Sequence, residues 1–206
     1  QSVMKLKFGM LYEDDLLSFF RVLAAQDVGA FTVNQCALQR LVPEVVRPSN
    51  TATLRADFAG YRLVGVGHRV VHGGAEYTHP VRVDASILTA LEKYIPLAPL
   101  HQPHNLAPIR VLRDRSPQMP QVACFDTAFH GTSPAVAQAF ALPKAITDLG
   151  VRRYGFHGLS YEYIASVLPQ HDARAAQGKT VVLHLGNGSS MCALAGGRSV
   201  ASTMGF

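Results

Sequence analysis

The stretch VVLHLGNGSSMCALAGGRSVASTMGF, residues 181–206, decides the class of fold. Its β-forming residues break at Gly186-Asn187-Gly188-Ser189-Ser190, resume, and break again at Gly196-Gly197. Asn-Gly and Gly-Gly pairs between apolar runs are typical of β-hairpins. The sequence therefore predicts a strand in KTVVLHLG (179–186), a returning strand in MCALAGG and a further strand in RSVAST.

The turn at 186–190 also predicts a site for an anion. Glycine adopts positive φ without strain and lets an anion approach the backbone N–H groups, and N–H groups that point in one direction bind phosphate. Asn187 and the serine hydroxyls add donors, and His184 precedes the turn. The alternative is an ordinary hairpin without a ligand, because Asn-Gly is also the commonest hairpin signal.

Outward from this stretch, the pattern mixes strands and helices. Helices are predicted where apolar residues recur at helical spacing, and strands where β-formers run together. The predicted strands lie at 3–12, 61–72 and within 121–129, ending at Asp126; the predicted helices lie at 14–26, 84–95 (capped by Asp84 or Ser86), 105–115, 133–142 and 159–168. Residues 28–60 are expected to be irregular, and 96–106 to form a proline-bounded loop. A mixed order predicts an α/β protein.

Composition excludes several classes of protein. The chain has 206 residues, 48% of them apolar, so it can build a core and is not expected to be disordered. No apolar run reaches the ~18 residues of a membrane span, and the N-terminus lacks the apolar region of a signal peptide. The net charge of +5 permits an anionic partner, but without basic and aromatic interleaving we expect a small anion rather than nucleic acid.

The cysteines indicate the redox compartment. Cys36, Cys124 and Cys192 are far apart in the sequence and odd in number. A disulfide framework or a zinc site is therefore not expected, and each cysteine is predicted to be a small core residue in a protein of the reducing cytosol.

The segment GHRVVHGG, residues 67–74, places charge in an apolar strand. Alternation puts His68 and His72 on one face and Arg69 on the other. A buried arginine near a strand end needs an anionic partner, and its guanidinium matches a carboxylate or phosphate. The alternatives are a structural ion pair for Arg69 and a metal site at His68 and His72, which is disfavoured because the two positions are about 13 Å apart on a strand.

Other polar residues lie at element ends. Asp126 ends a strand, where ligands of α/β proteins gather; the alternative is a helix cap or Asx turn. His157, in YGFHGLS, opens a helix, where backbone donors favour anions, although a lone histidine there is also compatible with a structural role. His101 and His104 are expected in the rigid loop, either at a pocket wall or simply solvated.

Taken together, these segments resemble the acetate kinase family. The resemblance covers about residues 64–206 and rests on the following motifs, in the order and spacing of the family: GHRVVHGG, LAPLHQPHNL, CFDTAFH, RRYGFHGLSY and HLGNGSSMCALAGGRSVASTMGF. It implies reversible phosphoryl transfer from ATP to acetate with Mg²⁺, in a cytoplasmic homodimer. Propionate and butyrate kinases are close relatives. It also implies the ribonuclease H-like fold of sugar kinases, actin and heat-shock ATPases.

The resemblance assigns residues to the carboxylate. Arg69 matches the arginine that binds the substrate carboxylate. Val71, Leu100 and Phe156 match an apolar pocket around the methyl group, and His101 matches a further site histidine.

The resemblance also assigns residues to phosphoryl transfer and to ATP. Asp126 matches the essential aspartate, and His157 matches the residue that stabilises the transition state. The matches to the ATP phosphate loop are His184, Leu185, Gly186, Asn187 and Gly188. Lys7 is a weaker candidate for an ATP contact, because only Leu6-Lys7-Phe8 resembles the end of the family's first phosphate loop.

The chain departs from the family pattern at both ends. Residues 9–60 match poorly, the family's magnesium-associated asparagine has no counterpart, and Phe206 falls roughly mid-protein. We expect a ribonuclease H-like domain with the carboxylate site at 1–130 and an incomplete nucleotide-binding domain at 131–206, so that the chain alone is poorly soluble or partnered and has little activity. The rival interpretations are a noncatalytic remnant that only binds, and a His-rich metal-dependent hydrolase.

Overall fold

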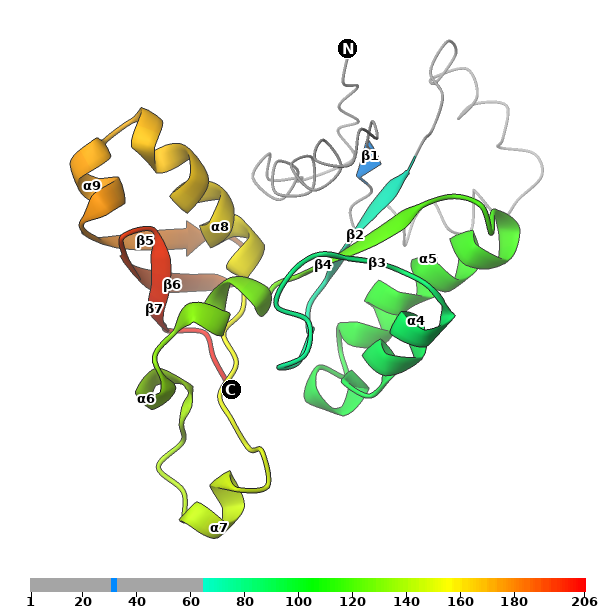
Figure 1. Ribbon diagram of the computed structural model, residues 1–206, viewed down its shortest axis with the longest axis horizontal. Coiled ribbons are helices and arrows are strands. Elements are labelled where there is room, and N and C mark those ends of the chain that lie inside the picture. The colour runs from blue at the N-terminus through cyan, green and yellow to red at the C-terminus, as the bar shows by residue number, and fades with distance from the viewer. Residues whose placement is uncertain (1–30, 33–64) are drawn as a thin grey trace. The chain divides into compact units, whose positions relative to one another are not determined.

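The computed structural model describes residues 31–32 and 65–206, and these fall into two compact units (Figure 1). The first unit comprises Gln1–Val70 and Pro80–Cys124, and the second comprises Val71–His79 and Phe125–Phe206. The predicted strand at 3–12 and helix at 14–26 lie outside the described residues. The expected domain boundary near residue 130 stays a prediction.

The first unit contains a mixed sheet with the strand order β1-β2-β4-β3. Its strands are β1 (Phe31–Thr32), β2 (Val66–Val70), β3 (Val81–Arg82) and β4 (Gln121–Phe125). β1 runs parallel to β2, whereas β3 runs antiparallel to β4. Every residue of β4 is buried, as its continuous apolar run predicts. The assignment of 28–60 as irregular is wrong at β1; the remaining residues of that range are not described.

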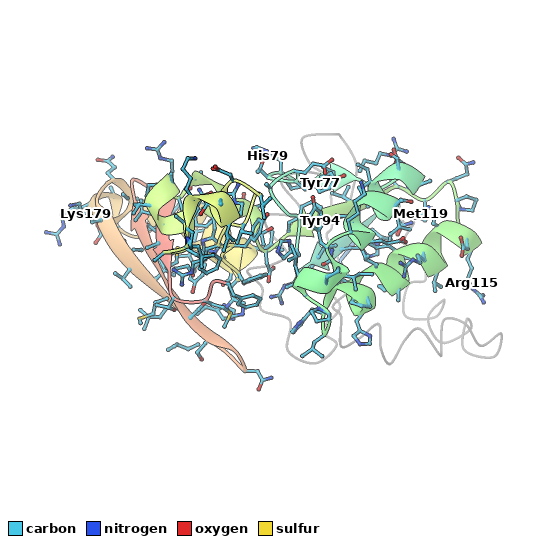
Figure 2. The ribbon with its side chains drawn as sticks, turned by 90° about the horizontal axis from the view of Figure 1, so that it is seen from below. Tyr77, His79, Tyr94, Arg115, Met119 and Lys179 are labelled. Atoms are coloured by element: carbon cyan, nitrogen blue, oxygen red, sulfur yellow. The ribbon has the colours of Figure 1, made fainter. Side chains whose placement is uncertain are left out.

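Two helices, side by side in Figure 1, pack in this unit. α4 (Ala85–Glu92) begins after Asp84, whose carboxylate accepts from the backbone N–H of Ile87 at 2.9 Å, so the predicted Asp84 cap is confirmed. α5 (Gln102–Arg115) is the longer helix, and Arg115 marks its end in Figure 2. The buried aliphatic side chains of the two helices are Leu88 and Leu91 on α4 and Leu106 and Ile109 on α5.

The predicted loop at 96–106 is too long. A 3₁₀ turn covers Ile95–Leu97, and α5 begins at Gln102 rather than near 105, so His104 lies within the helix and His101 at its N-cap. Proline is tolerated in the first helical turn because its missing N–H would have no intrahelical partner there. Pro103 is therefore compatible with the first turn of α5 and does not mark a loop.

The second unit contains the antiparallel sheet that the closing stretch predicts. Its order is β5 (Lys179–Leu185), β6 (Ser189–Ala195) and β7 (Arg198–Ser202). Gly196 and Gly197 both have positive φ, of 55° and 74°, as a tight hairpin turn between right-twisted strands requires. The hairpin predictions are thus confirmed.

One face of this sheet is covered by α8 (Gly158–Val167), which Figure 1 shows beside the strands. Tyr161 packs with Cys192 and Leu194 in a buried cluster. Along β5 burial alternates, and the opposite face carries exposed apolar side chains at Val181, Leu183 and Leu185. The predicted helix at 159–168 is confirmed, and so is the burial of Cys124 and Cys192 as free cysteines; Cys36 is not described.

Short elements complete the unit. These are the 3₁₀ turns Ala128–Thr132 and Leu168–Gln170 and the helices α6 (Ala135–Gln138), α7 (Lys144–Thr147) and α9 (Ala173–Gln177). The predicted helix at 133–142 is wrong beyond α6, because none of the α6 side chains is buried and a short helix needs packing to persist. Among the described residues, no helix combines the length and apolar character that crossing a membrane demands.

Candidate active site

The turn between β5 and β6 lies at one edge of the candidate site. Leu185 pairs with Ser189, so Gly186, Asn187 and Gly188 form the connection, and Ser189 Oγ donates to the carbonyl of Gly186 at 3.3 Å. The expectation that glycines of this turn use positive φ is wrong. The positive-φ glycines of the described residues are Gly74, Gly150, Gly196 and Gly197.

Gly188 lies beside His157. A Cβ atom on Gly188 would lie 3.5 Å from Cε1 and 3.6 Å from Nε2 of the His157 imidazole, which is ordinary van der Waals contact. The turn backbone therefore passes next to that ring. The fold thus brings together the turn and the histidine that the sequence predicted separately.

His157 occupies an unusual backbone conformation at the start of α8. It is the N-cap residue with φ 59° and ψ 21°, and it is the one positive-φ residue other than glycine in the part of the chain that is described. Histidine enters the left-handed region more often than most residues, but at a cost. Its Nδ1 lies 2.8 Å from Ser190 Oγ on β6, which fixes the ring.

Ser190 in turn hydrogen-bonds the Tyr161 hydroxyl. Both residues are buried, and burial raises the pKa of Tyr161, with the hydrogen bond to Ser190 acting in the opposite direction. The phenol is therefore protonated at neutral pH and available as a donor. This pair of hydroxyls behind His157 was not predicted from the sequence; Ser190 was quoted only as a donor of the turn.

His184 packs against His157. The ring centroids are 4.1 Å apart with an interplanar angle of 33°, and Nδ1 of His184 lies 3.0 Å from Ser160 Oγ. Each imidazole therefore has its Nδ1 atom on a serine hydroxyl. Two half-buried imidazoles beside a glycine turn can supply N–H donors to an anion.

The backbone of Asp126 is hydrogen-bonded to the start of α8, next to His157. It directly follows β4, as predicted, and is 1% exposed. The backbone N–H of Gly158 donates to the Asp126 carbonyl at 2.9 Å, and a Cβ on Gly158 would lie 2.1 Å from that oxygen. Only glycine fits there, so the residue after His157 is held directly against Asp126.

His130 supports the site without having been predicted. Its Nδ1 lies 2.8 Å from Ser199 Oγ and its Nε2 lies 2.9 Å from the carbonyl of Phe156. Burial lowers the pKa of His130, against the smaller upward effects of the Phe156 carbonyl and the Asp126 charge. Because both ring nitrogens bond within the protein, His130 fixes the segment that leads to His157. The sequence signal was its place in CFDTAFH.

The predicted carboxylate-site residues are divided between the units. Arg69, Leu100 and His101 belong to the first unit, where all three are exposed, Leu100 by 78%. The premise that Arg69 is buried is thus wrong: Arg69 is the exposed residue of β2, whose other residues are buried. Val71 and Phe156 belong to the second unit, where Val71 is half-buried and Phe156 is 4% exposed. Lys7 lies outside the described residues.

The structure gives the histidines of GHRVVHGG structural partners. His68 Nε2 hydrogen-bonds Gln121 Oε1 at 2.8 Å, and His72 Nδ1 accepts from the backbone N–H of Gly74 at 2.9 Å. Among the described residues, no group of three or more His, Cys, Asp or Glu side chains could hold a metal ion. The disfavoured metal interpretation of His68 and His72 gains no support.

The fold is that of the short-chain carboxylate kinases. A propionate kinase from Francisella tularensis subsp. tularensis SCHU S4 matches with a TM-score of 0.69 and 35% identity, over 80% of this chain and 42% of that one. An acetate kinase from Porphyromonas gingivalis matches with a TM-score of 0.67 and 30% identity, over 84% of this chain and 43% of that one. The expected α/β class with a mixed sheet is confirmed.

The chain belongs to the acetokinase family, whose model matches residues 23–206. Acetate kinase of Nitrobacter hamburgensis is 59% identical over 143 residues, and acetate kinase of Rhizobium meliloti is 59% identical over 145 residues. The matches cover 69% and 70% of this chain but 35% and 37% of those proteins. The chain therefore spans little more than a third of the length of these relatives.

Proposed function

We propose that the complete protein transfers a phosphoryl group reversibly between ATP and acetate, giving acetyl phosphate and ADP. The observation that carries the proposal is the packing of His157 and His184 at 4.1 Å beside the 186–188 turn. Supporting it, relatives 59% identical to this chain bear the name acetate kinase.

The main obstacle to the reaction is the electrostatic repulsion between the carboxylate and the phosphates of ATP. A carboxylate oxygen attacks the γ-phosphorus, the bond between that phosphorus and the ADP oxygen breaks, and ADP leaves. The carboxylic acid is ionised at neutral pH, since such groups titrate near about 4 to 5, so no general base is required. What the protein must supply is positioning and relief of repulsion between two anions.

We assign the positioning of the substrates and the relief of their repulsion to hydrogen-bond donors and cationic side chains of the site. Arg69 binds the carboxylate bidentately, while His157 and the backbone of the turn at 186–188, extended to His184 and Leu185, hold the phosphates. Asp126 acts by positioning Arg69 or the metal rather than by taking a proton. Val71, Leu100 and Phe156 surround the methyl group, with His101 nearby.

Propionate is the second candidate substrate, because the solved structure that matches at 35% identity is a propionate kinase. One methylene changes the selectivity of an apolar pocket by about 10- to 200-fold. The contrast between acetate and propionate therefore depends on small differences at the pocket residues.

Membership of the family supports proposals for the cofactors, the cellular compartment and the oligomeric state. ATP is the phosphoryl donor, Mg²⁺ would offset negative charge on its phosphates, and Lys7 is a further proposed contact to ATP. Within the described residues, no group of three or more His, Cys, Asp or Glu side chains could hold a metal ion. We further propose a cytoplasmic homodimer, no membrane or nucleic-acid partner, a carboxylate domain at 1–130 and a nucleotide domain beginning at 131.

The test is acetyl phosphate formation by the purified complete protein with Mg-ATP and acetate, propionate or butyrate in parallel. The proposal expects turnover that depends on the carboxylate. ATP hydrolysis without a carboxylate would favour a hydrolase. Nucleotide binding by calorimetry without any turnover would favour a binding-only remnant. Either result would overturn the proposed reaction.

A further inference from the structure

Two buried hydroxyl groups hold one ring nitrogen of His157. Ser190 Oγ lies 2.8 Å from His157 Nδ1 and 2.5 Å from the Tyr161 hydroxyl oxygen. Ser190 is 4% exposed and Tyr161 is 0% exposed. Because water does not reach these hydroxyls, the protein itself decides which atom donates and which accepts.

The three groups form a chain from Tyr161 through Ser190 to His157 Nδ1. Each hydroxyl has one proton and can also accept, so the chain can run in either direction. In the direction that belongs to the proposal below, Tyr161 donates to Ser190 and Ser190 donates to His157 Nδ1. A neutral imidazole that accepts at Nδ1 carries its proton on Nε2.

The other edge of the ring faces the turn. Nε2 and Cε1 are the imidazole atoms nearest to a Cβ built on Gly188, at 3.6 Å and 3.5 Å. His184 lies against one ring face at 4.1 Å between centroids and limits tilting of the ring. The ring is thus held at Nδ1, packed on a face, and turned with Nε2 toward the 186–188 turn.

We propose that Ser190 and Tyr161 are positioning residues for phosphoryl transfer, whose hydroxyl chain orients the Nε2–H of His157 toward the phosphate-binding turn. This inference rests on the function proposed above. A phosphoryl group in transfer carries negative charge on its oxygens, and a donor already fixed in place stabilises that charge without reorganising. Neither hydroxyl needs to touch a substrate.

The test measures the tautomer of His157 in the complete protein by ¹⁵N NMR of labelled histidines at about pH 8, above the ordinary histidine pKa. His157→Asn assigns the signal. The test variants are Ser190→Ala and Tyr161→Phe, and Ser190→Thr restores a hydroxyl on the same carbon. The control is Ser166→Ala. It removes a partly buried hydroxyl of α8 that donates to the Tyr163 carbonyl at 2.7 Å and not to an imidazole.

We expect a protonated Nε2 in the wild type and a mixture of tautomers in Ser190→Ala, with Ser190→Thr and Ser166→Ala like the wild type. We expect kcat to fall about 10- to 100-fold in Ser190→Ala, with the KM for the carboxylate changed less than about threefold, and Tyr161→Phe to be intermediate. Tyr161→Phe keeps the buried aromatic ring and removes only the hydroxyl. It therefore tests the inference even if Ser190→Ala fails to fold.

Two outcomes would overturn the inference: a wild type protonated at Nδ1, or hydroxyl-deleted variants that keep the wild-type tautomer and a kcat within twofold. The tautomer is read without any reaction. A tautomer change in a protein that lacks carboxylate kinase activity would therefore support the positioning of His157 while contradicting the proposed function.

Discussion

The backbone N–H of Gly158 donates to the carbonyl oxygen of Asp126 at 2.9 Å, and this bond joins the end of β4 to the start of α8. It ties the residue after His157 directly to Asp126, so two predicted site residues are held by backbone rather than by flexible side chains. The contact is so close that a methyl group at position 158 would lie 2.1 Å from the Asp126 oxygen.

We therefore expect Gly158→Ala to destabilise the protein by about 1 to 3 kcal/mol, the usual cost of forcing an extra carbon into a filled site. Urea unfolding measures the change. Gly131→Ala is the matched control, because its Cβ would meet Thr78 Cγ2 at an ordinary 3.5 Å, and we expect a change within about 0.5 kcal/mol. Equal stabilities for the two variants would contradict the close contact.

The left-handed backbone of His157 predicts an order of stability among its variants. At φ 59° the Cβ atom of alanine crowds the backbone, whereas glycine has no Cβ atom and adopts this φ without strain. His157→Gly should therefore be more stable than His157→Ala by about 1 to 2 kcal/mol, whereas both lose the imidazole. Thermal or urea unfolding of the pair gives the difference. An alanine variant as stable as the glycine variant would show that residue 157 is not held in this conformation.

Stability should fall in mildly acidic solution because of His68. Burial lowers its pKa from 6.5 to about 4, with the hydrogen bond to Gln121 opposing the shift. Between these values the unfolded chain binds a proton that the folded chain does not. The contribution of His68 to stability is therefore complete above pH 6.5, declines as the pH falls toward about 4, and changes no further below that value.

The slope expected from His68 alone is about 1.4 kcal/mol per pH unit within this window. His68→Gln, whose amide can still meet Gln121, should reduce the measured slope by about that amount. The pKa of His72 is also lowered by burial to about 4 and stays in the variant, so the difference between the two proteins isolates His68. Identical slopes would contradict a neutral buried His68.

Two substitutions in the complete protein test the charged residues of the proposed reaction. Asp126→Asn and Arg69→Ala should each reduce kcat/KM for the carboxylate by about 100-fold or more, the usual effect of losing an electrostatic group at a transition state. Arg82→Ala removes another exposed arginine of the same sheet and should leave the rate near that of the wild type. Near wild-type rates in Asp126→Asn or Arg69→Ala would remove that residue from the mechanism.

Local patterns predicted much of the second unit correctly. Glycine pairs between apolar runs predicted the β5–β6–β7 hairpins, and the segment after His157 predicted α8. These features depend on a few neighbouring residues and on turn conformations that few residue types adopt. The same reasoning was wrong for the start of α5, where Pro103 was taken as a loop signal although proline also fits a first helical turn.

By itself, the sequence determined the α/β class and the hairpins, and it predicted that Asp126, His157 and 184–188 belong to one family site, which stays a prediction. Only the tertiary structure decided that Ser190 and Tyr161 stand behind His157, that Gly188 lies next to the His157 ring, and that Arg69 is exposed. The reason is physical: turns and caps depend on residues a few positions apart, whereas the Ser190–His157 hydrogen bond joins residues separated by 33 positions and exists only once β6 and α8 have packed.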